Sequence, residues 1–271
     1  MFADDSVFLF HSKNEKTLEN IINNNLSIVF NWFCYNKLSL NVSKTCFMRF
    51  NQKNKKVGDL QIMINNIPLQ QVKTYKYLGL TIDENLKWNS HVDSIIKRLR
   101  GLIGAAKHFN QFLSTKYAKL FYNAHIHSVL SYLFEIWSNT SMSNLNRLQK
   151  LQNKAVKIIF NLSFRQSLAV EMKKLRILNI HQLKDLSHSK LIYNIQNSLK
   201  KTQQQLDVNA KKHQYSTRAA FHISQRRART TLATKSPIFV GIKIFNKLPS
   251  EFKSIKKLKT FSDELKKYYL N

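Results

Sequence analysis

Acidic residues are scarce in this sequence of 271 residues, in which 15 Asp and Glu stand against 44 Lys and Arg. The net charge of +29 excludes a balanced surface and predicts a polyanionic partner such as nucleic acid. Each phosphate that a basic side chain contacts releases condensed counterions, which makes binding favourable and dependent on salt. The alternative is that part of this charge belongs only to an ordinary solvated surface.

Cysteine is also scarce, since the sequence has only Cys34 and Cys46 and no His or Cys group to match them. A disulfide framework and a structural zinc site are therefore not expected. No apolar run approaches the ~20 residues needed to cross a bilayer, so no membrane association is expected. The start of the chain lacks the basic and apolar regions of a signal peptide. We expect an intracellular protein of the nucleus or cytoplasm, not a secreted one.

Hydrophobic residues make up 43% of the chain and aromatic residues 11%, which is enough to bury a core. Runs rich in β-formers predict strands at 2–11, 45–50, 61–69 and 75–83, with a bend at Asn65-Asn66 and a bulge or close backbone approach at Gly79. Apolar residues at three- and four-residue steps predict helices at 15–33, 92–106, 116–133, 145–160 and 260–269. The expected fold class is an α+β N-terminal part followed by a mostly α-helical remainder. In the first helix, the Asn run at 23–25 is the expected weak point.

Two adjacent carboxylates stand near the start of the chain, in the run Phe2-Ala3-Asp4-Asp5. Neighbouring positions of a tight turn can present both carboxylates to Mg²⁺, which prefers such oxygen ligands. Two-metal phosphoryl transfer depends on ligands of this kind. The alternative for an isolated Asp-Asp pair is a solvated turn.

Several motifs follow this pair in a fixed order. Residues 32–45 read W-F-C-Y-N-K-L-S-L-N-V-S-K-T, residues 75–83 read Y-K-Y-L-G-L-T-I-D, and L-K-W at 86–88 precedes His91. Further motifs are L-Q-K-L-Q-N-K-A at 148–155, T-R at 217–218 and F-N-K-L-P at 245–249. Together they resemble the reverse transcriptases of non-LTR (LINE-type, jockey-like) retrotransposons, from the palm motif F-A-D-D onward. Phe245 stands where Trp is usual in that family.

The resemblance implies roles for residues of the catalytic centre. Asp4 matches the metal-binding aspartate of the palm, and Asp5 its neighbour, so both are candidate Mg²⁺ ligands. Phe2 matches an aromatic residue near the primer end. Lys44 matches a lysine that can assist proton transfer to the leaving pyrophosphate, and the alternative is a surface lysine beside a strand.

The resemblance also implies residues that hold nucleic acid. Tyr77, Leu78 and Gly79 match the strand that holds the terminal phosphates of the primer, and the alternative for Tyr77 and Leu78 is core packing. A basic helix face at Lys97, Arg98, Arg100 and Lys107 matches the thumb, which follows the template–primer duplex. Its alternative is a solvated helix face. Trp32 and Trp88 are expected in the core.

The implied organisation is a partial palm at 1–90, a helical thumb-like and connection region at 91–199, a basic polar linker at 200–236 and a helical tail at 237–271. The implied function is that of a fragment of an RNA-directed DNA polymerase, a nucleotidyltransferase that binds an RNA template and a DNA primer as a hybrid. The alternative is a non-catalytic, basic nucleic-acid-binding protein derived from such an element.

We expect the purified chain to show no templated nucleotide incorporation. The family's third metal-binding carboxylate (motif A), its fingers and its motif B stand upstream of the Asp-Asp pair. Two carboxylates alone are expected to bind Mg²⁺ weakly or not at all and to position no nucleotide, which removes many orders of magnitude in rate. Primer extension on primed RNA tests this, and Mg²⁺-dependent extension that is lost in Asp4→Asn would contradict it.

Overall fold

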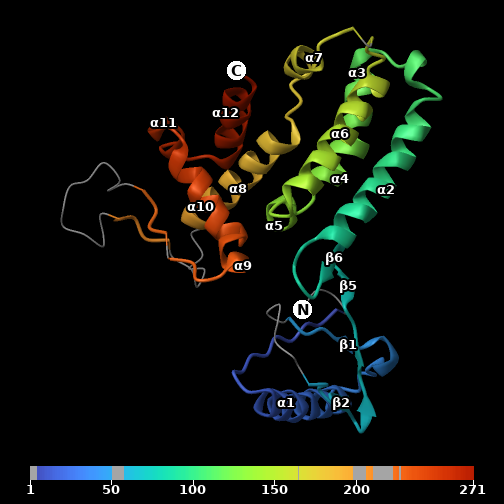
Figure 1. Ribbon diagram of the computed structural model, residues 1–271, viewed down its shortest axis with the longest axis vertical. Coiled ribbons are helices and arrows are strands. Elements are labelled where there is room, and N and C mark those ends of the chain that lie inside the picture. The colour runs from blue at the N-terminus through green and yellow to red at the C-terminus, as the bar shows by residue number, and fades with distance from the viewer. Residues whose placement is uncertain (1–4, 51–57, 164, 198–205, 210–221, 226) are drawn as a thin grey trace. The chain divides into compact units, whose positions relative to one another are not determined.

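The structure, a computed structural model, describes residues 5–50, 58–163, 165–197, 206–209, 222–225 and 227–271 (Figure 1). It is mostly helical with a few short strands, which confirms the expected small sheet component beside a mostly helical remainder. The chain divides into two compact units, 1–86 and 87–271. No helix in the described part of the chain is long and apolar enough to span a bilayer.

The described residues of the first unit form one long helix, a 3-10 turn and three pairs of short strands. Its elements are α1 (Glu15–Tyr35), the 3-10 turn η1 (Val42–Lys44), β1 (Cys46–Phe47), β2 (Met63–Ile64), β3 (Ile67–Pro68), β4 (Gln70–Gln71), β5 (Thr74–Tyr77) and β6 (Leu80–Asp83). Strands β1 and β4 pair in parallel, whereas β2–β3 and β5–β6 are antiparallel hairpins. The bend predicted at Asn65-Asn66 is confirmed as the turn between β2 and β3, where both residues have positive φ.

Helix α1 is held against the segment that leads into β2 by three side chains spaced four residues apart. Glu15, Glu19 and Asn23 accept hydrogen bonds from the backbone N–H groups of Gly58, Gln61 and Met63, at 3.3, 3.0 and 3.0 Å. The Asn23 amide also donates to the Gln61 carbonyl. Residues four apart lie on one helix face, so these three side chains point to the same backbone segment. They accept the hydrogen bonds that a neighbouring strand would otherwise accept from its N–H groups. The Asn run predicted as the weak point thus contributes a tertiary contact.

The core of this unit lies under the same helix. Leu26 of α1, together with Ile62 and Ile64, is buried, and partly buried hydrophobic residues from the turn at Val42 and the strand at Phe47 pack around them. Trp32, expected in the core, is half exposed instead. It lies outside the face of α1 that these residues cover.

The strand predicted at 2–11 is wrong for its described part. Asp5 occupies an isolated bridge position and residues 6–11 are not in a strand, while residues 1–4 lie outside the described residues. Val7, Phe8 and Leu9 are exposed. Strand propensity alone does not make a strand, because backbone N–H and C=O groups need a neighbouring strand to pair with.

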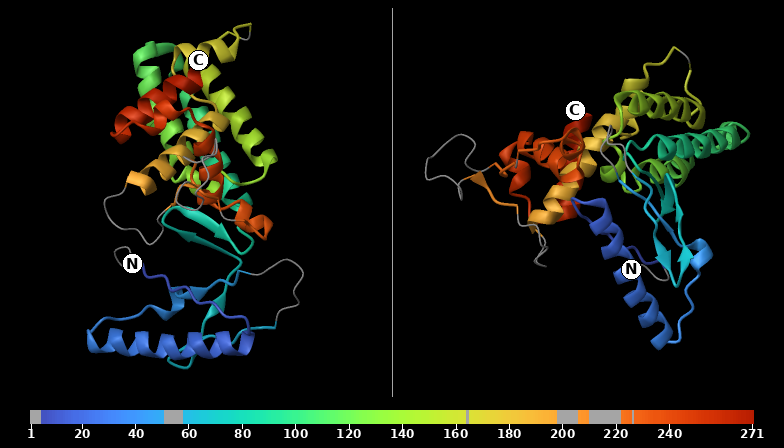
Figure 2. Two further views of the ribbon diagram at one scale, coloured as in Figure 1. Left: turned by 90° about the vertical axis from the view of Figure 1, so that its left-hand side faces the viewer. Right: turned by 60° about the horizontal axis from the view of Figure 1, so that its bottom comes forward.

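The second unit is a set of packed helices (Figure 2). They are α2 (Asn89–Ala106), η2 (Asn110–Phe112), α3 (Thr115–Phe121), the π-helix η3 (Tyr122–His127), α4 (Ser128–Ser131), α5 (Phe134–Trp137), α6 (Met142–Ile159), α7 (Leu168–Lys174), α8 (Ile180–Asn197), α9 (Thr231–Thr234), α10 (Pro237–Lys247), α11 (Ser250–Lys253) and α12 (Leu258–Leu270). The predicted helices at 92–106, 116–133, 145–160 and 260–269 all correspond to helical segments. Trp88 is buried, as expected.

Helix α8 packs against both α10 and α12, which lie beside it in Figure 1. Gly241 of α10 faces Ile192 of α8 so closely that an added Cβ would lie 2.8 Å from the Ile192 Cγ1. Part of the predicted linker is hydrogen-bonded to α10, the helix that contains Asn246. Ile223 is buried, and its backbone N–H and C=O both bond to the Asn246 side chain at 2.9 Å.

A buried histidine on α8 joins it to the turn after α5. The His188 ring is fully buried and hydrogen-bonds the Lys184 carbonyl through Nδ1 at 2.9 Å. Its Nε2 lies 3.1 Å from the Asn139 side-chain nitrogen. A carbonyl only accepts and an amide nitrogen only donates, so these contacts fit the neutral ring with its proton on Nδ1. Burial lowers the pKa of His188 to about 4.

We expect the stability of the protein to fall as the pH drops from about 6.5 to 4. The unfolded chain takes up a proton at position 188 near pH 6.5, whereas the folded chain resists protonation down to about pH 4. The unfolded state therefore binds more protons in this window, at a total cost of roughly 3 kcal/mol of folding free energy. Urea unfolding from pH 7.5 to 4 measures it, and His188→Gln should make the profile flatter. An unchanged profile in that variant would contradict this origin.

Candidate nucleic-acid interface

The predicted primer-holding residues lie at a hairpin turn. Tyr77 pairs with Leu80 at the end of the β5–β6 ladder, so Leu78 and Gly79 form a two-residue loop. Both have positive φ, 46° and 79°, as in the turn type that matches the twist of an antiparallel hairpin. The strand predicted at 75–83 is therefore interrupted: its two halves are the strands β5 and β6, and Gly79 lies in the turn between them and not at a bulge, while the alternative of a close backbone approach at Gly79 stays a prediction. The sequence suggested a strand because its β-forming residues run on both sides of the turn.

This turn holds a non-glycine residue in a strained conformation. A leucine at positive φ costs on the order of 1 kcal/mol, and such strain persists only where the surroundings fix it. Tyr77 and Leu78 are half-buried, whereas Gly79 is exposed. The turn therefore presents a side-chain-free backbone to solvent beside two anchored side chains.

The other predicted residues of the catalytic centre are less fully placed. Phe2 and Asp4 lie outside the described residues. Asp5 is exposed, and so is Lys44, whose backbone N–H bonds to the Asn41 side chain at the end of η1. No group of three or more His, Cys, Asp or Glu side chains gathers as a metal site within the described ranges, which do not include Asp4.

In the second unit, the predicted basic face consists of Lys97, Arg98 and Arg100 of α2 and of Lys107, which caps the C-terminal end of α2. All four are exposed. Arg100 and Lys107 line a groove between α2 and α6, whereas Lys97 and Arg98 do not line it. The groove has a volume of about 440 Å³ and is lined by Ile96, Arg100, Ile103, Gly104, Lys107, Arg147, Lys150, Leu151 and Lys154. We call it the α2–α6 groove.

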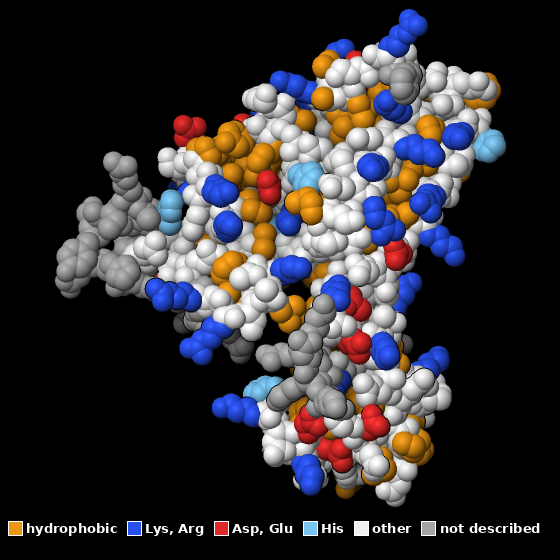
Figure 3. Space-filling model, in the orientation of Figure 1, with side chains coloured by type: hydrophobic (Ala, Val, Ile, Leu, Met, Phe, Trp, Pro, Cys, Tyr) orange, Lys and Arg blue, Asp and Glu red, His pale blue; other side chains and the backbone are white. Residues whose placement is uncertain are grey.

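Positive charge dominates the α2–α6 groove. Five of its nine lining residues are basic, and none of those the structure describes there is acidic. In Figure 3, basic side chains gather over the α2 side of this unit, with hydrophobic side chains between them. Cations on both sides of one groove attract an anion more strongly than the same number spread over a surface. The arrangement can therefore bind a phosphate-bearing polymer without any covalent chemistry.

Three of these cations come from α6 and were missed by the sequence analysis. Arg147, Lys150 and Lys154 recur at three- and four-residue steps, which places them on one helix face. That spacing was readable from the sequence. The packing of this face beside α2 was not, because it depends on which helices are neighbours.

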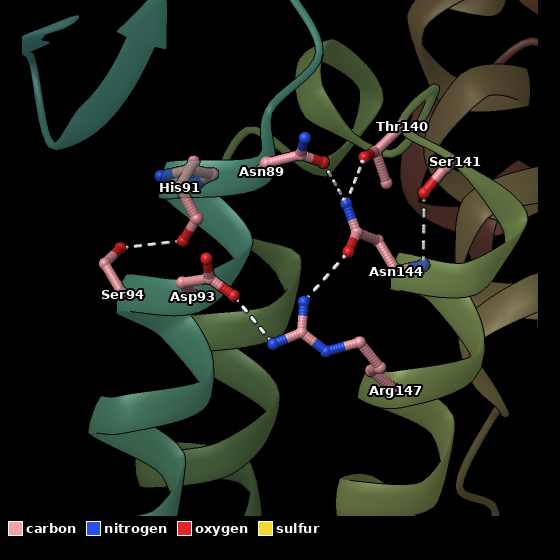
Figure 4. Close-up of polar contacts among 8 residues, drawn as sticks. All are labelled: Asn89, His91, Asp93, Ser94, Thr140, Ser141, Asn144 and Arg147. Atoms are coloured by element: carbon pink, nitrogen blue, oxygen red, sulfur yellow. Dashed lines mark hydrogen bonds and ion pairs between the residues drawn. The ribbon is translucent and has the colours of Figure 1, made fainter.

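Helices α2 and α6 run parallel and are joined near both ends. At their N-terminal ends the buried Asn144 amide donates to Asn89 Oδ1 and Thr140 Oγ1, at 2.8 and 2.9 Å (Figure 4). At the other end, the Asn110 amide donates to the carbonyl of Ile158 at 2.8 Å. These bonds fix the register of the two helices.

Arg147 is oriented by the same network. Its guanidinium donates to Asn144 Oδ1 at 3.0 Å and forms an ion pair with Asp93 of α2 at 2.7 Å (Figure 4). The Asp93 carboxylate offsets part of this charge. Lys150, Lys154, Arg100 and Lys107 have no such partner among the ion pairs between described residues, so they carry most of the net charge of the groove.

Known proteins similar to this chain come from mobile elements of Drosophila melanogaster. The "Probable RNA-directed DNA polymerase from transposon X-element" is 27% identical over 58% of this chain and 18% of its own length. The corresponding protein from transposon BS is 26% identical over the same shares. A 115 kDa protein assigned to the type-1 retrotransposable element R1DM is 29% identical over 38% of this chain and 10% of its own length. The chain thus spans about a fifth of the length of its first two relatives, and no family profile or solved structure matches it.

We expect Asn144→Ala to destabilise the protein by about 1–3 kcal/mol, because it removes the three hydrogen bonds that this buried side chain makes to Asn89, Thr140 and Arg147. Asp93→Asn should change stability by less than about 1 kcal/mol, because this ion pair is largely exposed and screened. Urea unfolding of both variants measures the difference. Equal losses in the two variants would contradict this, because they would show that the exposed ion pair contributes as much as the buried amide.

Proposed function

Two relatives of this chain are named as probable RNA-directed DNA polymerases of transposons and a third as a protein of a retrotransposable element, and on this premise we propose that the chain is a reverse-transcriptase-like fragment of a non-LTR retrotransposon that binds a template–primer hybrid. The first unit would correspond to part of a polymerase palm, and residues 91–199 of the helical unit to a thumb-like and connection region. The RNA template and the DNA primer are the proposed partners. The net charge of +29 supports a polyanionic ligand.

The observation that carries this proposal is the α2–α6 groove. Its cations lie on two helices that a buried hydrogen-bond network holds in register, so they do not need to be brought together when the ligand arrives. Preorganised charge costs little entropy on binding. Contacts of this kind recognise the sugar–phosphate backbone and carry no sequence information, as copying of any template requires.

The roles of the residues in the first unit belong to the same proposal. Within a longer polymerase that supplies the motif A carboxylate, Asp4 and Asp5 would hold Mg²⁺, whereas in this chain alone they are expected to hold it weakly or not at all. The carboxylate of Asp5 is exposed. Phe2 would lie near the primer end, and the exposed Lys44 would be free to supply a proton to the leaving pyrophosphate. The turn at Tyr77, Leu78 and Gly79 would hold the terminal phosphates of the primer, with Gly79 allowing close backbone approach.

A non-catalytic nucleic-acid-binding role is favoured by one specific observation. The α2–α6 groove belongs entirely to the helical unit, which contains none of the proposed catalytic residues. Binding would therefore not depend on the carboxylates. In the double variant Asp4→Asn/Asp5→Asn, hybrid binding should persist.

We expect the full chain to bind an RNA–DNA hybrid with a steep dependence on salt. With about five phosphate contacts, log K should fall against log salt with a slope of roughly −4. Fluorescence anisotropy with a labelled hybrid at several salt concentrations, from about 50 to 200 mM, measures it. Polyglutamate serves as a control for charge alone and should compete poorly. Affinity that does not change with salt would remove the proposal.

A further inference from the structure

We propose that the α2–α6 groove holds the sugar–phosphate backbone of one strand, with its phosphates between the two rows of cations and its sugars over the apolar floor. This inference rests on the proposed function and adds how a strand lies in the groove and which residues contact it. It assigns a direct role to α6, through Lys150 and Lys154, alongside Arg100 and Lys107 of α2.

The two rims of the groove match one another in length. Arg100 and Lys107 are seven residues apart on α2, and Arg147 and Lys154 are seven apart on α6. At 1.5 Å per residue each rim extends over about 10 Å, which corresponds to roughly three nucleotide steps of a strand. Because the helices run parallel and in register, both rims can follow the same short stretch of backbone.

The floor of the groove determines which part of the strand it suits. Ile96, Ile103 and Leu151 line it, and no aromatic residue is among the described lining residues. Base stacking platforms are built from aromatic side chains, so this floor suits the less polar faces of sugars rather than bases. Contact through the backbone alone makes the groove indifferent to sequence.

Gly104 keeps the groove open on the α2 side. It is one of the lining residues, and an added Cβ would meet nothing within 4 Å. Gly101, one turn earlier on the same helix, also has open space at its Cβ position but does not line the groove. These two glycines therefore form a matched pair in which only one substitution would fill the site.

The first test removes charge at two places. Lys150→Ala/Lys154→Ala should weaken hybrid binding at least about tenfold at 0.1 M salt and reduce the salt slope by about 2. Lys256→Ala/Lys259→Ala removes the same charge from exposed positions of the same unit outside the groove, and should change affinity less than about twofold. Circular dichroism and thermal unfolding confirm that both variants are folded.

The second test blocks the groove without changing charge. Gly104→Phe should reduce the affinity for the hybrid by about tenfold or more, because the ring would occupy the groove and displace the strand from its phosphate contacts. Gly101→Phe should leave the affinity within about twofold of the wild type, because position 101 does not line the groove. Neither substitution meets a neighbouring atom at Cβ, so both helices should remain intact.

The outcomes separate this inference from the proposed function. If the wild-type chain binds no hybrid, the proposed function fails. If the wild-type chain binds the hybrid but both charge variants weaken binding equally, the overall positive charge of the protein accounts for binding and the groove assignment is overturned. The assignment is also overturned if Gly104→Phe leaves the affinity unchanged. Selective loss in Lys150→Ala/Lys154→Ala and in Gly104→Phe supports it.

Discussion

The amide of Asn144 is the contact on which the arrangement of α2 and α6 depends. It is buried and bonds to α2, to the preceding turn and to Arg147, so any sliding of one helix along the other would leave several polar groups unpaired. Leaving such groups unpaired in a protein interior costs more than their pairing contributes. Two helix faces that are each simply basic thereby become the opposite sides of one groove.

The first unit solves a different problem with a similar device. Its described strands are two to four residues long and pair with one another only in twos, so they do not form a continuous sheet. Helix α1 compensates by offering Glu15, Glu19 and Asn23 to the backbone that leads into β2. In both units, polar side chains at regular helical spacing fix the position of a neighbouring segment, while hydrophobic burial supplies the bulk of the stabilisation.

Helices α1, α2, α6 and α12 were predictable because their apolar periodicity is local, whereas α8 has 18 residues and was not among the predicted helices. The turn at Leu78 was not predictable, because leucine rarely adopts a positive φ. This backbone conformation is imposed by the pairing of Tyr77 with Leu80. The pairing of α6 with α2 was missed because spacing identifies a helix face but not its neighbour. Asp4 and Phe2 lie outside the described residues, so their placement stays a prediction.

The close approach at Gly241 has a consequence for how the sequence can change over time. With the Ile192 side chain fully buried and 2.8 Å from where a methyl group would begin, position 241 has no spare volume. Overpacked cores lose stability as cavities do. A larger residue at position 241 is therefore expected only after a substitution that makes the side chain at position 192 smaller. Gly101, on the open surface of α2, can be substituted without a change elsewhere.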